Sequence, residues 1–123
     1  MGDILTMKYL DEIKRSMLFL AENSKTIFIG QSVAYPGNAI YGSLKEVAPE
    51  KKIELPVFEE TQMGISIGLA LEGFIPVSIF PRFNFLIIAL NQLVNHLDKI
   101  PHISQGKLAP KVIIKTMVGS VRP

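Results

Sequence analysis

The sequence predicts an α/β domain built on an open, doubly wound, mostly parallel sheet with helices on both faces. Short apolar runs rich in β-branched residues alternate with longer segments of helical periodicity, which is the pattern of such sheets. The hydrophobic content is 48% with no tryptophan, so the surplus is aliphatic, as suits strands that are buried on both faces. At 123 residues the chain has room for one domain with its own core, so we expect a single domain over residues 1–123.

Charge and composition exclude several classes of function. Thirteen basic residues against eleven acidic ones give a net charge of +2, and they are scattered, so no footprint for nucleic acid is visible. The chain contains no cysteine, which excludes disulfides and cysteine metal sites and fits a reducing compartment. Residues 83–97 are apolar but too short and too rich in asparagine for a membrane span. We expect a soluble, cytoplasmic protein with no nucleic-acid or membrane partner.

The N-terminal part of the chain predicts a helix, a buried strand and a second, short helix. Residues 26–30 (TIFIG) are β-branched and apolar and predict the strand. The Pro-Gly pair at 36–37 predicts a loop over residues 31–38, and a short helix is expected over residues 41–47. Helical periodicity covers residues 4–23, where five apolar side chains share one face: Leu5, Tyr9, Ile13, Met17 and Leu20.

The middle of the chain predicts a strand, a helix and another strand. Residues 53–58 are the second strand candidate, and residues 74–80 are the third. The helix between them is expected over residues 61–71 and carries Gly64 and Gly68 on one face. Glycine inside a helix costs about 1 kcal/mol relative to alanine, so two of them on one face predict the close approach of another backbone.

The C-terminal part predicts one long helix and a fourth strand. The helix is expected from residue 83 or 84 to residue 99 and is apolar on most sides, which is typical of a buried helix, often at an interface. Residues 101–110 predict a polar loop, and residues 111–117 (KVIIKTM) predict the strand. No helix is expected after this strand, so we expect the domain to be incomplete at its C-terminal end.

Candidate functional residues follow the predicted strands. Gln31 comes after the first strand, Glu59 after the second, and Pro81, Phe83 and Phe85 after the third. The carboxyl ends of parallel strands meet at one edge, where the ligands of open α/β sheets bind. We therefore expect these side chains to converge at that edge. Glu59 also stands between two apolar runs, and a buried carboxyl group is costly unless something uses it.

Each candidate also has a purely structural interpretation. Glu59 could be a helix N-terminal carboxylate that the helix dipole favours. Phe83 and Phe85 could be ordinary core residues. His96 and His102 lack carboxylate partners at ligand spacing, so we assign no metal-ligating residue.

Two segments resemble a known family. They are PVFEETQMGISIGLALEGFIPV (residues 56–77) and FPRFNFLIIALNQLVN (residues 80–95). They are similar to the Pro-Ile-x-Glu segment, the Gly-Ile-Ala-x-Gly helix and the Phe-Asn-Phe and Gln-x-x-Asn motifs of the pyrimidine-binding domain of transketolase-class thiamine diphosphate enzymes. The resemblance is strongest to the beta subunit of the 2-oxo acid dehydrogenase first component, of the pyruvate dehydrogenase type. It covers nearly the whole chain and implies the thiamine diphosphate-binding fold.

The resemblance implies a role for each candidate residue. In the family a glutamate bonds a ring nitrogen of the cofactor's aminopyrimidine, and Glu59 occupies that position, which makes it the catalytic candidate. Burial favours the protonated form of a carboxyl group, so such a group can share a proton with a ring nitrogen. Phe85 would stack on or flank the pyrimidine. Pro81, Phe83 and Gln31 are the further cofactor-binding candidates, beside Glu59 itself.

The sequence departs from the family's pattern in three places. The Gln-Ser pair at 31–32 stands where acidic residues are usual, and the Pro-Arg pair at 81–82 replaces a more neutral pair. The Gly-Asp-Gly motif that binds diphosphate and magnesium is absent, since the one Gly-Asp pair is Gly2-Asp3. In this family the site forms between a pyrimidine domain and a diphosphate domain, often on separate chains. The resemblance therefore implies an alpha-type partner chain that holds the magnesium.

Two main hypotheses follow. The first is a beta-type component of a thiamine diphosphate-dependent enzyme that acts on a 2-oxo acid or a ketose, forms a homodimer or heterotetramer, and is inactive without its alpha-type partner. The second is a non-catalytic or regulatory domain of the same fold that dimerises through residues 83–99. An unrelated small α/β ligand-binding domain would explain the patterning but not the gapless motifs. The sequence does not determine the substrate.

Overall fold

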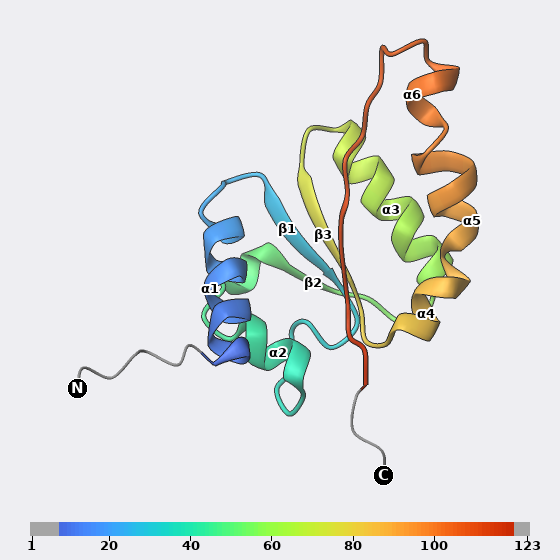
Figure 1. Cartoon of the computed structure of the whole chain (residues 1–123). Coiled ribbons are helices and arrows are strands. Elements are labelled where there is room, and N and C mark those ends of the chain that lie inside the picture. The colour runs from blue at the N-terminus through green and yellow to red at the C-terminus, as the bar shows by residue number, and fades with distance from the viewer. Residues whose placement is uncertain (1–7, 120–123) are drawn as a thin grey trace, which may run out of the picture.

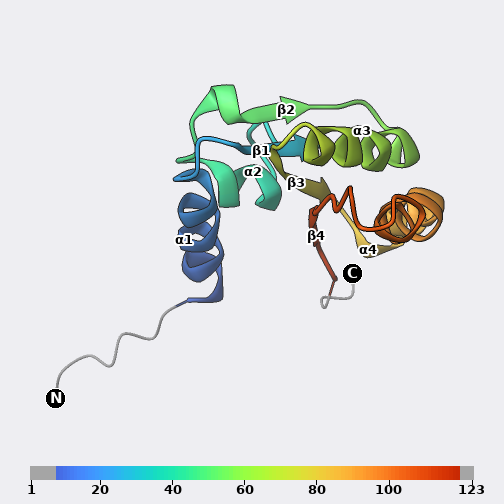
Figure 2. The same ribbon diagram turned by 90° about the horizontal axis from the view of Figure 1, so that it is seen from above.

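A four-stranded sheet forms the centre of the structure. The computed structural model describes residues 8–119. All neighbouring strands in it are parallel (Figure 1), and their spatial order is β2-β1-β3-β4, as the labels of Figure 2 show. The open parallel α/β sheet predicted from the sequence is confirmed. The strands are β1 (Thr26–Gly30), β2 (Lys52–Glu54), β3 (Ile75–Phe80) and β4 (Ile113–Thr116).

Helices cover both faces of the sheet, as predicted (Figure 2). α1 (Tyr9–Ala21) and α2 (Ala39–Leu44) pack on one face, against Phe28, Val77 and Ile79. α3 packs on the other face together with the segment that connects β3 to β4. The elements on this second face are α3 (Glu59–Leu71), α4 (Phe83–Ile88), α5 (Leu90–Gln92), the π-helical turn η2 (Leu93–Leu97) and α6 (Ile100–Ile103).

The winding of the chain creates a switch point between β1 and β3. The connection from β1 to β2 passes over one face through α2, whereas the connections from β2 to β3 and from β3 to β4 pass over the other. The loops that leave these two neighbouring strands therefore turn toward opposite faces. Ligands of open α/β sheets bind in the crevice that such a divergence leaves at the carboxyl ends. The doubly wound arrangement thus places a candidate binding edge beyond Gly30 and Phe80.

The elements of the N-terminal part differ from the prediction at their ends. α1 begins at Tyr9, and residues 4–7 of the predicted helix lie outside the described residues. Tyr9 was expected on the buried face but is 78% exposed, because the first turn extends past the sheet, while Met17 is buried as expected. α2 begins at Ala39, two residues earlier than predicted, because the Asn38 side chain caps it by accepting the Tyr41 amide at 2.8 Å.

The second strand is shorter than predicted. Residues 53–58 were expected to form it, but β2 ends at Glu54, and only the bond from Leu55 N to Gly30 O at 2.9 Å continues the pairing. Pro56 has no N–H to donate, so the ladder cannot extend further. α3 then starts at Glu59 instead of residue 61, with Glu59 and Glu60 in its first turn, where the helix dipole favours acidic side chains.

The prediction of one long buried helix over residues 83–99 is wrong in two respects. It is interrupted at Ala89, where ψ is 2°, and again by η2, where Asp98 N bonds Leu93 O at 3.0 Å. It is also not buried on most sides, since only one stripe packs against α3. The spacing of apolar residues alone does not show which side of a helix packs against another element. The exposed fraction lies between 41% and 55% for Phe83, Ile87, Ile88, Leu90 and Val94.

Two smaller expectations are also corrected. The first three residues of the loop predicted over residues 101–110 instead belong to α6, a helix of a single turn (Ile100–Ile103). Pro101 lies at its start, where proline is well tolerated. The close backbone approach predicted at Gly64 and Gly68 is not found among residues 8–119. A Cβ at Gly64 would lie 3.7 Å from the Gln92 side chain, and one at Gly68 would meet nothing within 4 Å.

None of the helices within residues 8–119 has the length and apolar character that a membrane span needs.

Gly30 leaves no room for a side chain between β1 and β3. Its φ is +153°, and a Cβ built on it would lie 2.2 Å from the Ile79 carbonyl oxygen. Neither the backbone conformation nor the space accepts a side chain. The carboxyl ends of the two central strands are therefore held together at a glycine.

We predict that Gly30→Ala destabilises the fold by about 3 kcal/mol or more, because overpacking and backbone strain add at this position. The matched variant Gly68→Ala should instead stabilise it by about 0.5–1 kcal/mol, since alanine is the better helix former and its Cβ meets open space. Urea unfolding followed by circular dichroism measures both. Equal effects of the two substitutions would contradict this account.

Candidate functional site

The five residues predicted from the sequence all lie at the carboxyl-end edge of the sheet. Gln31 directly follows β1 and Pro81 directly follows β3, and both are half-buried. Glu59 is the first residue of α3 and is 6% exposed. Phe83 begins α4 and is 53% exposed, whereas Phe85, one half-turn later, is half-buried. In Figure 1 the first turn of α3 lies beside α4, and the two helices are in contact.

Glu59 combines burial with an unused carboxylate. Its side chain takes part in no hydrogen bond or ion pair with the residues of the 8–119 range. The N-terminal dipole of α3 favours an acidic group here, as the structural interpretation of this residue expects. That interpretation explains the position of the carboxylate but not its burial. A buried carboxyl group without an internal partner remains free to bond a ligand.

Gln62 fixes the turn that carries Glu59 to the sheet. It is fully buried, and its Nε2 donates to Ser78 Oγ at 3.1 Å and to Ile79 O at 2.9 Å. The same nitrogen lies 3.2 Å from the position that a Cβ of Gly30 would occupy. Its Oε1 is buried and finds no partner among the described residues. Sequence reasoning missed this residue, although a glutamine in the buried stripe one turn after Glu59 was a signal.

Glu54 holds the loop that carries Gln31. Its carboxylate accepts the backbone amides of Ser32 at 2.7 Å and Ala34 at 3.1 Å, and Ser32 sits in the left-handed region with φ of 64°. Gln31 in turn lies against the segment before α3, since its Nε2 donates to Pro56 O at 3.5 Å. Sequence reasoning also missed Glu54. It is an acidic residue at the end of an edge strand, next to a polar loop.

The aromatic residues form an outer part of the same edge. The Phe83 amide donates to Met117 O at 3.0 Å, which attaches the start of α4 to the end of β4. With 53% of its surface exposed, Phe83 is not the core residue that its structural interpretation requires. Its ring and that of Phe85 are thus available for contact with a flat ligand or another chain.

No metal centre accompanies this edge. Within residues 8–119, no group of three or more histidine, aspartate or glutamate side chains could hold a metal ion. His96 instead lies on the helical segment, where its Nδ1 is 2.7 Å from Gln92 Oε1.

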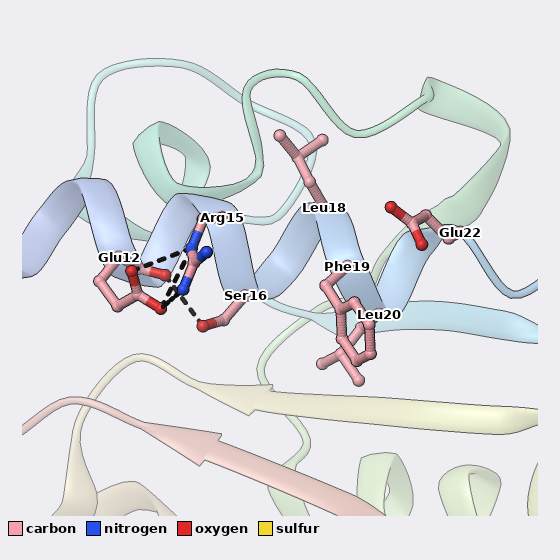
Figure 3. A pocket seen from close by; sticks show the side chains of 7 residues that line it. All are labelled: Glu12, Arg15, Ser16, Leu18, Phe19, Leu20 and Glu22. Atoms are coloured by element: carbon pink, nitrogen blue, oxygen red, sulfur yellow. Dashed lines mark hydrogen bonds and ion pairs between the residues drawn. The ribbon is translucent and has the colours of Figure 1, made fainter.

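A separate hollow lies along α1, away from the predicted residues (Figure 3). Its volume is about 780 Å³. Leu18 points to one side of the helix while Phe19 and Leu20 point to the other, and the Arg15–Glu12 ion pair of 2.8 Å occupies its polar end. The polar groups do not converge on one point, as they do in a small-molecule site. We assign no ligand to this hollow.

Lys115 is a half-buried cation on the other face of the sheet. Its Nζ donates to Ser43 Oγ at 2.6 Å, and no carboxylate within residues 8–119 forms an ion pair with it. Burial lowers the pKa of its ammonium group because the charged form loses hydration.

We predict that Glu54→Ala costs about 2–3 kcal/mol of stability, because it leaves the amides of Ser32 and Ala34 without their charged acceptor. Glu50→Ala, at an exposed glutamate in a 3-10 turn, is the control and should change little. Urea unfolding measures both variants, and backbone amide shifts of residues 31–34 should change only in the first.

The Lys115 ammonium should make stability depend on pH. Its pKa is lower in the folded chain than in the unfolded one, so between these values the unfolded chain binds more protons. The free energy of unfolding should therefore rise as pH increases through that window toward the ordinary lysine pKa of about 10.4. Lys115→Met removes this contribution. In urea unfolding, the free energy of unfolding of the wild type relative to that of Lys115→Met should increase from about pH 7 to about pH 10. A difference between the two that does not change with pH would exclude the effect.

Comparison with known proteins finds relatives among the beta subunits of two dehydrogenases. The mitochondrial pyruvate dehydrogenase E1 component subunit beta of Pisum sativum is 28% identical over 103 residues, covering 81% of this chain and 29% of the relative. The corresponding subunit of Rhizobium meliloti (strain 1021) is 25% identical over 122 residues, covering 96% and 26%. The 2-oxoisovalerate dehydrogenase subunit beta of Bacillus subtilis (strain 168) is 25% identical over 117 residues, covering 92% and 36%. No protein-family model matches the chain.

These relatives are much longer than the chain, which spans between 26% and 36% of their length. Their names agree with the resemblance inferred from residues 56–95. The chain is thus similar to the beta subunits of 2-oxo acid dehydrogenases, over most of its own length and a minor part of theirs.

Proposed function

We propose that the chain is a beta-type component, or part of one, of a thiamine diphosphate-dependent enzyme that acts on a 2-oxo acid or a ketose. The observation that carries this proposal is the buried side chain of Glu59 in the first turn of α3, whose carboxylate has no hydrogen-bond partner within residues 8–119. It occupies the position that the family motif gives to the glutamate bonding the aminopyrimidine. The names of the relatives favour a 2-oxo acid over a ketose.

Glu59 would form a hydrogen bond with a ring nitrogen of the cofactor's aminopyrimidine. A carboxyl group on a mostly buried side chain, with no hydrogen bond to the residues of the 8–119 range, fits this task because its oxygens remain available to a ligand. Gln62 keeps the first turns of α3 on the sheet, so the position of the carboxyl group does not depend on the ligand. The residues present therefore fit the pyrimidine end of the cofactor.

The aromatic residues would orient the pyrimidine. Phe85, half-buried at the same edge, would stack on or flank the ring, with Phe83 and Pro81 beside it. Gln31 would close the other side, from the loop that Glu54 holds. Thiamine diphosphate supplies the nucleophilic carbon and the electron sink when bound, while these residues supply position and exclude water.

The remaining part of the site would come from an alpha-type chain. The sequence lacks the Gly-Asp-Gly motif, and residues 8–119 offer no acidic cluster for magnesium. The proposal therefore assigns the diphosphate and its magnesium ion to the partner, in a heterotetramer or a related assembly, and the chain alone would be inactive. Within it, residues 1–123 would serve as one pyrimidine-binding domain.

We predict that thiamine diphosphate with magnesium binds measurably when the chain is mixed with an alpha-type subunit carrying the diphosphate-binding domain. Glu59→Gln should weaken this binding by about ten- to a hundredfold, because it removes a charge-assisted hydrogen bond worth about 1.5–3 kcal/mol. Isothermal titration calorimetry measures both, with the chain alone and with the mixture.

Glu72→Ala, at an exposed glutamate at the far end of α3, is the control and should bind like the wild type. Absence of binding in every combination, together with a stable dimer of this chain, would refute the proposal.

A second candidate function has one observation in its favour. The apolar side chains of α4, α5 and η2 that sequence analysis expected to be buried are half-exposed: Phe83, Ile87, Ile88, Leu90 and Val94. Apolar side chains gathered on one helical segment mark an interaction surface. A non-catalytic domain that dimerises through this segment would use it without any cofactor. The same calorimetry separates the two functions.

A further inference from the structure

Glu60 links α3 to the irregular helical segment through side-chain hydrogen bonds. Its Oε1 accepts Asn91 Nδ2 and, at 3.4 Å, Gln92 Nε2. Both donors belong to α5, which lies in contact with α3. Gly64, one turn further along α3, leaves room for the Gln92 side chain, since a Cβ there would be 3.7 Å from Gln92 Oε1.

Each of the two amides is itself held by a second donor. Asn91 Oδ1 accepts Asn95 Nδ2 at 2.9 Å, and Asn95 Oδ1 accepts Lys99 Nζ at 3.3 Å. This branch starts at a cation and ends at the Glu60 carboxylate, with every N–H directed toward the carboxylate. Hydrogen bonds that run in one direction polarise one another.

The second branch has the same direction. Because Gln92 turns its nitrogen toward Glu60, its oxygen faces His96, whose Nδ1 at 2.7 Å then carries the proton. The two branches thus converge on one oxygen of Glu60. We call Glu60 and these five residues of α5 and the turns after it the Glu60 network: Asn91, Gln92, Asn95, His96 and Lys99.

The Glu60 network acts on a short helix, α5, whose neighbours on both sides interrupt the regular helical structure. α5 is three residues long and lies between the interruption at Ala89 and the π-helical turn η2. The regular α-helical hydrogen-bond pattern is therefore interrupted on both sides of α5, so that pattern alone does not set its direction. Side-chain contacts with α3 must therefore help to fix it, and α4, which carries Phe85, precedes it directly.

We propose that Glu60 is a positioning residue, which through the Glu60 network fixes α4 and α5 against the first turn of α3 and so sets the aromatic side chains relative to Glu59. The assignment of the ligand that they enclose rests on the proposed function. The network itself does not, since it concerns contacts within this chain.

The test compares Glu60→Ala with Glu60→Gln in the whole chain. Glutamine keeps the Oε1 acceptor that receives both amides, whereas alanine removes it. Amide hydrogen exchange of residues 90–97, measured by mass spectrometry, should become about tenfold faster in Glu60→Ala and stay near the wild-type rate in Glu60→Gln. Glu72→Ala, at the other end of α3, should leave this exchange unchanged. Unchanged exchange in Glu60→Ala would overturn the network.

The positioning role needs a second readout. With the alpha-type subunit and magnesium present, thiamine diphosphate should bind Glu60→Ala about tenfold more weakly, with Glu60→Gln near wild type. Faster exchange with unchanged affinity would refute the positioning role. A wild-type chain that binds no thiamine diphosphate would refute the proposed function, and the exchange measurement would still decide on the network.

Discussion

The buried amide of Gln62 joins α3 to the sheet at the carboxyl ends of β1 and β3. It donates to Ser78 and to the Ile79 carbonyl, beside the position where Gly30 has no room for a Cβ. In a buried site such bonds are costly to lose, because both donor and acceptor would remain without water. The amide therefore fixes the position of α3 on the sheet and its rotation about its own axis. The same contact places Glu59, which lies one turn earlier in α3, at the carboxyl-end edge of the sheet.

The two loops at the switch point are fixed by equally specific bonds. Glu54 holds the loop after β1 through two backbone amides, and Met117 O accepts the amide at the start of α4 after β3. Each bond connects a loop to the end of a neighbouring strand. Loops held by the ends of strands can present side chains with the precision that a binding site needs. The parallel sheet is thus the scaffold, and these polar bonds turn its edge into a defined surface.

The central strands could be predicted from the sequence because they are buried on both faces, which makes β1 and β3 read as continuous apolar runs. The edge strand β2 could not be delimited, since its end depends on Pro56 and on one bond to Gly30. The position of Glu59 at the edge followed from chain order and strand direction. Gln62, Glu54 and Glu60 were missed because their partners are 16 to 32 residues away in sequence. The pattern of apolar and polar residues reveals the periodicity of an element, but not which residues far apart in the sequence come into contact.

The two adjacent carboxylates at the start of α3 have opposite surroundings. Successive residues of a helix point about 100° apart, so neighbours in sequence need not share an environment. Glu60 faces α5 in the exposed layer, where two amides and the donors behind them satisfy it. Glu59 faces inward, where the described residues offer it no hydrogen bond. A helix N-terminus that served stability alone would gain more from two exposed, hydrogen-bonded carboxylates. This difference is the physical reason for assigning Glu60 to the framework and, in the proposed function, Glu59 to the ligand.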